Sequence, residues 1–283
     1  MMENENIFKE EITTNQEIET RDKAELFKFA FCGTNDAFND KLEKLAQLAE
    51  YEKWCYEGRE DEPYHILKYY ILDTFSRCKI ENKILYSTDN EYCAFNTGLL
   101  TKNSQDILGV FIKNPKQDNQ PWKLTKFIAC ENIDYMNKFN SIPELARYWQ
   151  TYEELYFNPD LDIQLNIDHI LDDNWNRISP VLGDSFNKFI VKQMLTGSII
   201  ETKAKIKRNM RLAVPQYYRE KIMFLIPVSF QIEENKTVTL AMAVEKMNDK
   251  QYRANTIFTL DMAYSKARQL MRPEADWLMT KEK

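Results

Sequence analysis

The chain has 283 residues, of which 38 are Lys or Arg and 44 are Asp or Glu, so its formal net charge is −6. This acidic balance excludes a wholly basic nucleic-acid coat protein. Hydrophobic residues make up 43% of the chain, which is enough for a sizeable core and excludes disorder along the whole length.

The cysteines and the first residues predict a cytoplasmic protein that contacts no membrane. The five cysteines are odd in number and no two have the two-residue spacing of zinc sites, so we expect reduced thiols. The chain opens with MMENENIFKEE, which is acidic, whereas an export signal starts with basic residues and continues with apolar ones. No apolar run approaches the roughly 20 residues that a membrane-spanning helix needs.

Residues 1–23 are predicted to form an acidic, flexible arm in front of a single α+β domain over residues 24–283. Within the first 20 residues, six Glu side chains oppose Lys9 alone, and few apolar residues accompany them. This composition is typical of solvated segments that do not build a core.

The first part of the domain is predicted to contain two helices followed by strands. Apolar residues recur at helical spacing over residues 38–57 and again, after Pro63, over residues 63–80. Three β-rich runs separated by short polar breaks then predict an antiparallel meander over residues 84–114.

The middle of the chain has a mixed pattern. KFIAC (126–130) predicts another strand. A helix is then predicted to open at Ser141, because Pro143 follows at a first-turn position and Glu144 lies three residues after the serine.

The C-terminal part again shows helical periodicity followed by β-rich runs, and both patterns are clearer there. A long apolar stripe predicts a helix over residues 185–213, which Pro215 ends. Three apolar runs predict a second meander over residues 221–260, and Asp261 is expected to cap a helix over residues 262–271. Helices and strands are grouped rather than alternating, which favours an α+β fold; we find no internal sequence repeat.

A basic cluster within residues 201–221 is the first candidate site. Lys203, Lys207 and Arg211 step by four along one predicted helix face, and Arg208 lies beside them. We call these four residues the basic ridge. Such a ridge can follow phosphates, because each neutralised phosphate releases a counterion. The aromatic side chains of the same region supply stacking on bases, so the binding prediction extends to Tyr217 and Tyr218. The alternative is a solvated face whose long side chains cover the core.

An acidic stretch supplies the second candidate. Asp168 and Asp172 share one predicted helical face, and His169 lies between them in the sequence. Two carboxylates and an imidazole can hold a divalent ion and transfer a proton during phosphodiester hydrolysis. The spacing matches neither a helical HExxH motif nor a calcium loop, and the alternative is that these residues form turns and helix caps.

Two further candidates are isolated residues. FNTGL (95–99) predicts a turn or bulge at Gly98 that exposes Asn96 to a ligand. Arg268 lies away from the apolar stripe of the last helix and faces either a cleft or solvent. Neither GxxxxGK[ST] nor GxGxxG occurs, which disfavours nucleotide binding by the usual glycine-rich loops.

Several segments together resemble a known domain family. They are TFSR (74–77), FNTGL (95–99), DHILDDNWNR (168–177), AVPQYY (213–218), FLIPV (224–228) and TIFTLDMAYSKARQLMRPEADWL (256–278). The family is uncharacterised, mainly bacterial, and sometimes joined to OST-HTH (LOTUS) or cold-shock RNA-binding modules. The resemblance spans about residues 24–278 and implies an association with nucleic acid but no mechanism.

The sequence therefore leaves three functional hypotheses. The first is binding of RNA, single-stranded nucleic acid or a nucleotide by the basic ridge with Tyr217, Tyr218 or Arg268. The second is a metal-dependent phosphodiesterase or nuclease that uses Asp168, His169 and Asp172. The third is a protein–protein adaptor, such as a phage-defence component. The sequence identifies no cofactor and no metal.

Overall fold

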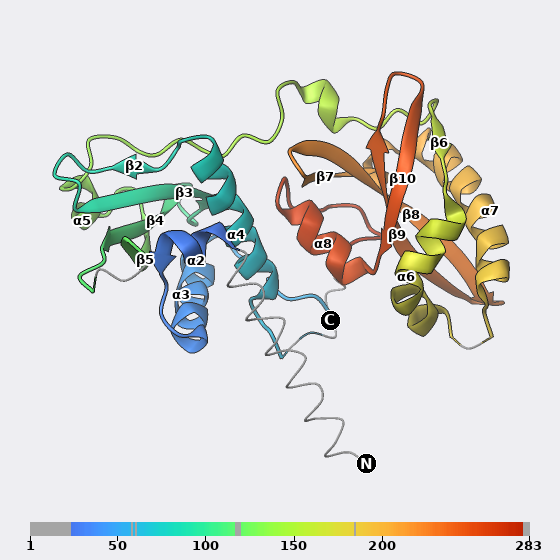
Figure 1. The fold of residues 1–283 in the computed structure, drawn as a ribbon, viewed down its shortest axis with the longest axis horizontal. Coiled ribbons are helices and arrows are strands. Elements are labelled where there is room, and N and C mark those ends of the chain that lie inside the picture. The colour runs from blue at the N-terminus through green and yellow to red at the C-terminus, as the bar shows by residue number, and fades with distance from the viewer. Residues whose placement is uncertain (1–23, 58, 60, 117–119, 184, 280–283) are drawn as a thin grey trace, which may run out of the picture. The chain divides into compact units, whose positions relative to one another are not determined.

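The computed structural model describes residues 24–279 apart from residues 58, 60, 117–119 and 184. The chain divides into two compact units, the first with Met1–Cys55 and Asp61–Arg147 and the second with Tyr56–Glu60 and Tyr148–Lys283. Each unit combines helices with a five-stranded sheet (Figure 1), which confirms the predicted α+β class. The predicted acidic arm lies outside the described residues, and the single domain stays a prediction.

The first unit has the strand order β1-β5-β4-β3-β2, in which β1 pairs with β5 in parallel and the remaining pairs are antiparallel. Its elements are α2 (Glu25–Phe29), β1 (Ala30–Phe31), α3 (Asn35–Leu48), α4 (His65–Ile80), β2 (Leu85–Tyr86), β3 (Tyr92–Leu100), β4 (Asp106–Lys113), β5 (Trp122–Ala129) and α5 (Ile133–Met136). The meander predicted over residues 84–114 is therefore confirmed, as is the strand at KFIAC.

Aromatic rings join the helices of the first unit to its sheet. The ring of Phe75 on α4 meets those of Phe95 and Phe111 at centroid distances of 5.2 and 5.8 Å. Gly109 lies directly opposite Phe95 in the sheet, and the Phe95 ring covers the place that a Cβ atom would take. The missing side chain thus lets a large ring lie flat across two strands.

The second unit has the strand order β6-β10-β9-β8-β7, in which β6 pairs with β10 in parallel. Its elements are the 3₁₀ turn η1 (Tyr152–Leu155), β6 (Asp162–Gln164), α6 (Ile167–Leu182), α7 (Lys188–Ile206), the 3₁₀ turn η2 (Met210–Leu212), β7 (Val214–Tyr218), β8 (Lys221–Glu233), β9 (Lys236–Lys246), β10 (Gln251–Phe258) and α8 (Leu260–Arg268). The meander predicted over residues 221–260 is confirmed, and β7 extends it by one strand.

The two faces of the second sheet have different coverings. Alternate residues of the central strands, such as Phe224, Ile226 and Met242, belong to the buried core that α6 and α7 complete. Helix α8 contacts β7 and β9 and lies across the sheet from α6 and α7 (Figure 1). We call the sheet surface beneath it the α8 face. Strand register places on that face Gln216, Tyr218, Lys221, Glu245 and Arg253.

Both units have the same topology, although the sequence shows no repeat. In each, a short first strand is followed by helices, then by a four-stranded antiparallel meander whose last strand returns beside the first. The two units thus share a topology that no repeat in the sequence indicates. The repeat is invisible in the sequence because only the strand order is shared, not the residues.

The predicted helices are confirmed, but their ends differ from the predicted ones. The largest difference is in the helix predicted over residues 38–57. The helix predicted over residues 38–57 begins earlier and stops at Leu48, because the N–H of Glu50 donates to the carbonyl of Leu100 at 2.8 Å and draws the chain into extended structure. The helix predicted over residues 185–213 is α7, followed by the separate turn η2. The last helix, α8, starts after Thr259 rather than at Asp261.

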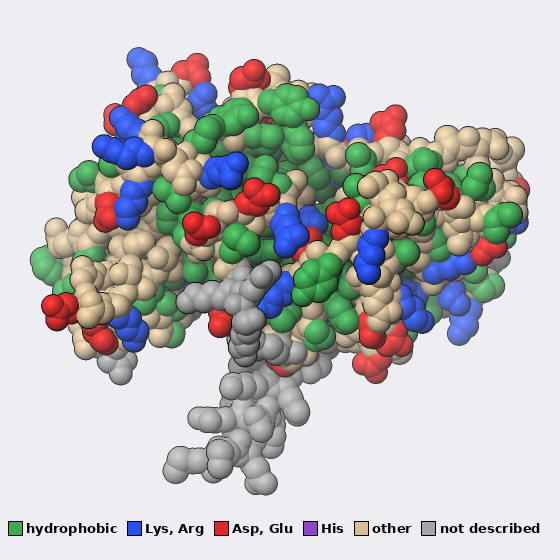
Figure 2. All heavy atoms as spheres, turned by 180° about the vertical axis from the view of Figure 1, so that it is seen from behind, with side chains coloured by type: hydrophobic (Ala, Val, Ile, Leu, Met, Phe, Trp, Pro, Cys, Tyr) green, Lys and Arg blue, Asp and Glu red, His purple; other side chains and the backbone are tan. Residues whose placement is uncertain are grey.

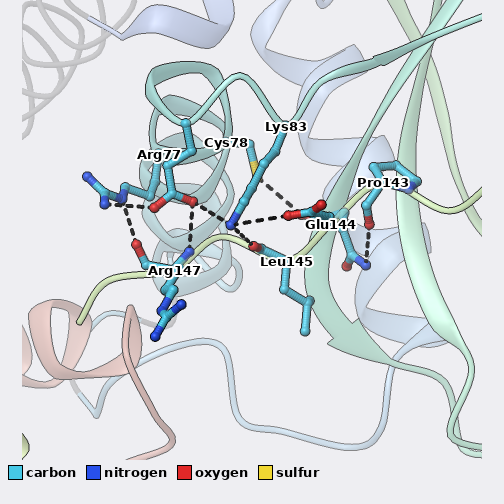
Figure 3. Close-up of polar contacts among 9 residues, drawn as sticks. Arg77, Cys78, Lys83, Pro143, Glu144, Leu145 and Arg147 are labelled. Carbon is cyan, nitrogen blue, oxygen red and sulfur yellow. Dashed lines mark hydrogen bonds and ion pairs between the residues drawn. The ribbon is translucent and has the colours of Figure 1, made fainter. Parts of the chain in front are cut away.

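The helix predicted to open at Ser141 is absent. The backbone N–H and C=O groups of residues 143–147 instead form hydrogen bonds with side chains of α4, of the loop that follows it and of β3. Lys83 Nζ donates to the Leu145 carbonyl at 2.7 Å, and Arg77 Nε donates to the Arg147 carbonyl at 2.8 Å (Figure 3). The Arg147 N–H donates to the carboxylate of Glu81 at 2.9 Å. Tertiary hydrogen bonds therefore replace the helical ones.

Glu81 is the centre of this arrangement. Its carboxylate also lies 2.7 Å from Arg77 and 2.9 Å from Lys83. Burial raises the pKa of Glu81, but the hydrogen bonds from Lys83 and the Arg147 N–H, together with the charge of Arg77, outweigh burial and hold the pKa below its ordinary value of 4.5.

We predict opposite effects for alanine at two glycines. Gly109→Ala forces a Cβ into the fixed ring of Phe95 and should lower the free energy of unfolding by about 1–3 kcal/mol. Gly197→Ala, in the middle of α7 with open space around it, should raise it by about 0.5–1 kcal/mol. Urea unfolding curves measure both, and equal midpoints for the two variants would contradict the packing described for Phe95.

The Glu81 cluster predicts an acid-dependent loss of stability. Because the folded pKa lies below the unfolded one, the carboxylate stabilises the fold above pH 4.5, and this contribution disappears as the pH falls through the folded pKa. Glu81→Gln should therefore destabilise the protein at pH 6 and approach the wild type at pH 3. Thermal melting at both pH values tests this, with Glu43→Gln on the exposed side of α3 as the control. A deficit of equal size at both pH values would contradict it.

Candidate functional site

The acidic segment proposed for catalysis lies on the exposed surface of α6. Asp168 pairs with Lys192 at 2.7 Å and Asp172 with Lys188 at 2.5 Å, while His169 Nε2 lies 3.3 Å from its helix neighbour Asp173. The hydrogen bond from Lys188 lowers the pKa of Asp172. Each carboxylate is thus neutralised separately, and the three predicted catalytic residues do not converge on one point.

Other kinds of reactive centre find no support in the described part of the chain. Among these residues no group of three His, Cys, Asp or Glu side chains could hold a metal ion. The five cysteines form no disulfide, and burial raises the pKa of Cys78 to about 12, which removes it as a nucleophile at neutral pH. No described helix has the length and apolarity needed to cross a membrane.

The basic ridge lies at the C-terminal end of α7 and in η2. Lys207 pairs with Asp160 at 2.6 Å, Lys203 donates to the Leu161 carbonyl at 2.8 Å, and Arg208 donates to the Ala204 carbonyl at 2.7 Å. Fifteen residues of helix separate Lys192 from Lys207, which is about 22 Å at 1.5 Å per residue. The basic ridge and the acidic segment therefore occupy opposite ends of α7 and share no site.

The α8 face carries a second and denser group of charges. Glu245 is only 8% exposed, and its two carboxylate oxygens contact different cations, Lys221 at 2.7 Å and Arg253 at 3.1 Å. These contacts run across three neighbouring strands, β8, β9 and β10. The buried carboxylate thus holds a cation from each neighbouring strand beside it.

Tyr218 borders this trio at the end of β7. Its ring is 46% exposed and has two cations within reach, Arg219 at 5.2 Å and Lys266 of α8 at 5.7 Å from the ring centroid. Lys266 also lies 5.2 Å from the centroid of Phe258. Tyr218 is thus flanked by its neighbour in the sequence, Arg219, and by Lys266 from a helix far along the chain.

The turn between β7 and β8 holds Arg219 and Glu220 in a strained backbone conformation. Tyr218 pairs with Lys221, so the turn has two central residues, and Arg219 and Glu220 adopt φ values of 49° and 62°. This is the type I′ geometry for which Asn-Gly is the favoured sequence. Each charged residue in this conformation costs about 1 kcal/mol or more, and such strain is concentrated at functional sites.

The remaining predicted site residues, Tyr217, Arg268 and Asn96, are all partly or fully buried. Tyr217 points to the opposite face from Tyr218, and its ring packs against Tyr148 at 4.9 Å. Arg268 is partly buried at the last position of α8. The proposal that Asn96 is exposed is wrong. Its side chain is 2% exposed, its Nδ2 donates to the Pro143 and Asp106 oxygens, and its Oδ1 accepts from the N–H of Gly98.

Sequence reasoning missed Glu245 on the α8 face and Lys266 on the helix that covers it. Both lie within patterns that read as ordinary strand and helix, and only the strand register and the packing of α8 bring them to Tyr218. Basic and acidic side chains are interspersed over the surface that Figure 2 shows, so a charged ligand has to recognise a local arrangement rather than a field of one sign.

Comparison with known proteins gives a family and no function. No curated protein and no solved structure matches this chain. A family model matches residues 45–277, which is well over half of the chain and includes parts of both units. The chain therefore belongs to the family described as Domain of unknown function (DUF3825).

Proposed function

We propose that the second unit binds RNA, another single-stranded nucleic acid or a nucleotide derived from it, through the α8 face and the β7–β8 turn. The observation that carries this proposal is the exposed ring of Tyr218 with Arg219 and Lys266 beside it. Every base has a flat face that stacks on an aromatic ring, and every phosphate needs a cation, so ring and cations together suit both halves of a nucleotide.

The charge balance of the surface supports a phosphate-containing ligand. Four cations, Arg219, Lys221, Arg253 and Lys266, lie on or beside this surface, and two of them contact the carboxylate of Glu245. A local excess of positive charge attracts an anion from solution, and the buried position of Glu245 holds two of the cations in place.

The basic ridge extends the proposed site toward a longer ligand. Arg211 lies in η2 just before the edge strand β7, on the side of the sheet that α7 covers, so a ligand has to pass around this edge to contact both Arg211 and Tyr218, a span of at most about 23 Å of extended chain. The ridge's ion pair between Lys207 and Asp160 is exposed to solvent, which screens it, so a phosphate can replace the carboxylate at little cost. We therefore favour an oligonucleotide over a mononucleotide.

Of the other hypotheses, only the adaptor has an observation in its favour. Phe189 and Ile200 are strongly exposed on α7, and exposed apolar side chains mark protein contacts when they form a patch. The metal-dependent phosphodiesterase has none, because Asp168, His169 and Asp172 do not converge.

Tyr218→Ala should weaken binding of a fluorescein-labelled single-stranded RNA of about ten nucleotides by about 5- to 150-fold, because one stacking contact is lost. Fluorescence anisotropy at several salt concentrations measures the dissociation constant. Lys236→Glu, at the exposed first residue of β9, reverses a charge at the far end of the β8–β9 hairpin from Glu245 and serves as the control. Affinity that is unchanged by Tyr218→Ala, or that does not fall with salt, would contradict the proposal.

The double variant Lys207→Glu/Arg211→Glu tests the extension along the basic ridge. It should weaken binding of the RNA and flatten its salt dependence, since fewer counterions are released, while a labelled mononucleotide should bind as to the wild type. Equal losses for both ligands would mean that the variant has disturbed the fold. If the variant binds both ligands as tightly as the wild type does, the site is confined to the α8 face. A DNA strand of the same sequence, measured alongside, shows whether the ribose hydroxyl is recognised.

A further inference from the structure

Glu245 is a buried carboxylate that contacts two exposed cations of the α8 face. The side chain of Lys221 is 66% exposed and that of Arg253 is 49% exposed, although both head groups contact the same buried group. Lys221 Nζ lies 2.7 Å from one carboxylate oxygen, and a terminal nitrogen of Arg253 lies 3.1 Å from the other. One buried anchor therefore holds two cationic head groups at a surface that a ligand can reach.

The strand register explains why these two cations need an anchor. Arg253 lies directly opposite Glu245 on β10, whereas the residue of β8 that faces Glu245 is Met223, two positions after Lys221. The Lys221 side chain therefore has to lean along its strand to reach the carboxylate. Neighbouring cations repel each other, and a long exposed side chain loses rotamer freedom when it is fixed. Without the carboxylate, we expect the two head groups to move apart into solvent.

We infer that Glu245 is a positioning residue, which holds Lys221 and Arg253 together as a clamp for one phosphate of the bound nucleic acid. The inference rests on the proposed function and adds the place of a phosphate to it. Lys221 pairs with Tyr218 across β7 and β8, so the clamp begins one strand spacing, about 4.8 Å, from the residue whose ring stacks on a base. Arginine presents a planar fork of donors and lysine a point charge, and both suit phosphate oxygens.

The direction of one substitution's effect separates positioning from charge balance. Glu245→Gln keeps the size and polarity of the side chain and removes a negative charge from the surface. If Glu245 only offsets the charge of its neighbours, the variant should bind RNA more tightly and with a steeper salt dependence, because one charge less opposes the phosphates. If Glu245 holds the two cations together, the variant should bind RNA more weakly despite the lost negative charge.

The test is fluorescence anisotropy of the fluorescein-labelled RNA at several salt concentrations. Glu245→Gln should weaken binding by about three- to tenfold, because the hydrogen bonds to one phosphate are lost. The slope of log affinity against log salt should become shallower by about 0.7, the value for one phosphate of a single strand. Glu234→Gln, in the exposed β8–β9 turn, removes the same charge at the far end of the hairpin and should leave the affinity within about twofold.

Two further variants keep the test independent of a folding defect, which thermal melting of the ligand-free proteins detects. Glu245→Asp retains the charge but shortens the side chain by one methylene group, so positioning predicts weaker binding and charge balance predicts no change. Arg253→Gln removes one side of the clamp, so adding Glu245→Gln to it should cost little more, whereas independent effects would add. If Glu245→Gln does not fold, the comparison of Glu245→Asp with the wild type decides.

The outcomes separate this inference from the proposed function. Tighter or unchanged binding by Glu245→Gln overturns the positioning role and leaves the binding function standing. Weaker binding with an unchanged salt slope means that no phosphate contact has been lost, and it overturns the clamp. Failure of the wild type to bind RNA overturns the proposed function and this inference with it.

Discussion

The parallel pairing of each unit's first strand with its last constrains both folds. Strands β1 and β6 are very short, yet they lie beside β5 and β10, the final strands of their meanders. Neighbouring parallel strands cannot be joined by a hairpin, so the chain has to cross over before the meander begins. The helices supply that crossover, and they cover one face of each sheet while the other face is left for later segments.

The later segments differ between the units, and this difference explains where the candidate site lies. In the first unit an apolar cluster with Tyr135 and Phe139 closes the second face. In the second unit the covering element is α8, whose buried residues include Ala263 and Ala267 and whose Lys266 reaches the rim of the sheet. Small side chains let the helix lie close to the strands, so the charged residues around it remain near solvent.

Much of the fold is predictable from local pattern, because hairpin breaks and helical periodicity are properties of neighbouring residues. The two meanders and the helices α4, α7 and α8 follow from such patterns. Strands β1 and β6 are too short to show a period, and their partners lie far away in the sequence. The false helix after Ser141 fails for a related reason: the side chains of Lys83 and Arg77 outcompete a local capping pattern.

The candidate site is less predictable than the fold. The excess of Lys and Arg in residues 201–221 is visible in the sequence and directs attention to Tyr218 and Lys221. The buried carboxylate of Glu245 reads as an ordinary strand residue until the register places it between Lys221 and Arg253. Asn96 shows the converse: an apparent turn motif whose polar groups are all consumed within the protein.

The strained turn at Arg219 and Glu220 lowers the stability of the fold next to the candidate site. Asn-Gly would relieve the left-handed strain at both positions, and it requires only ordinary substitutions. Selection for heat resistance alone would therefore converge on that pair and remove a cation from beside Tyr218. An Asn-Gly pair at these positions would therefore exchange the cation beside Tyr218 for stability. Laboratory evolution for heat resistance should replace Arg219 and Glu220 early.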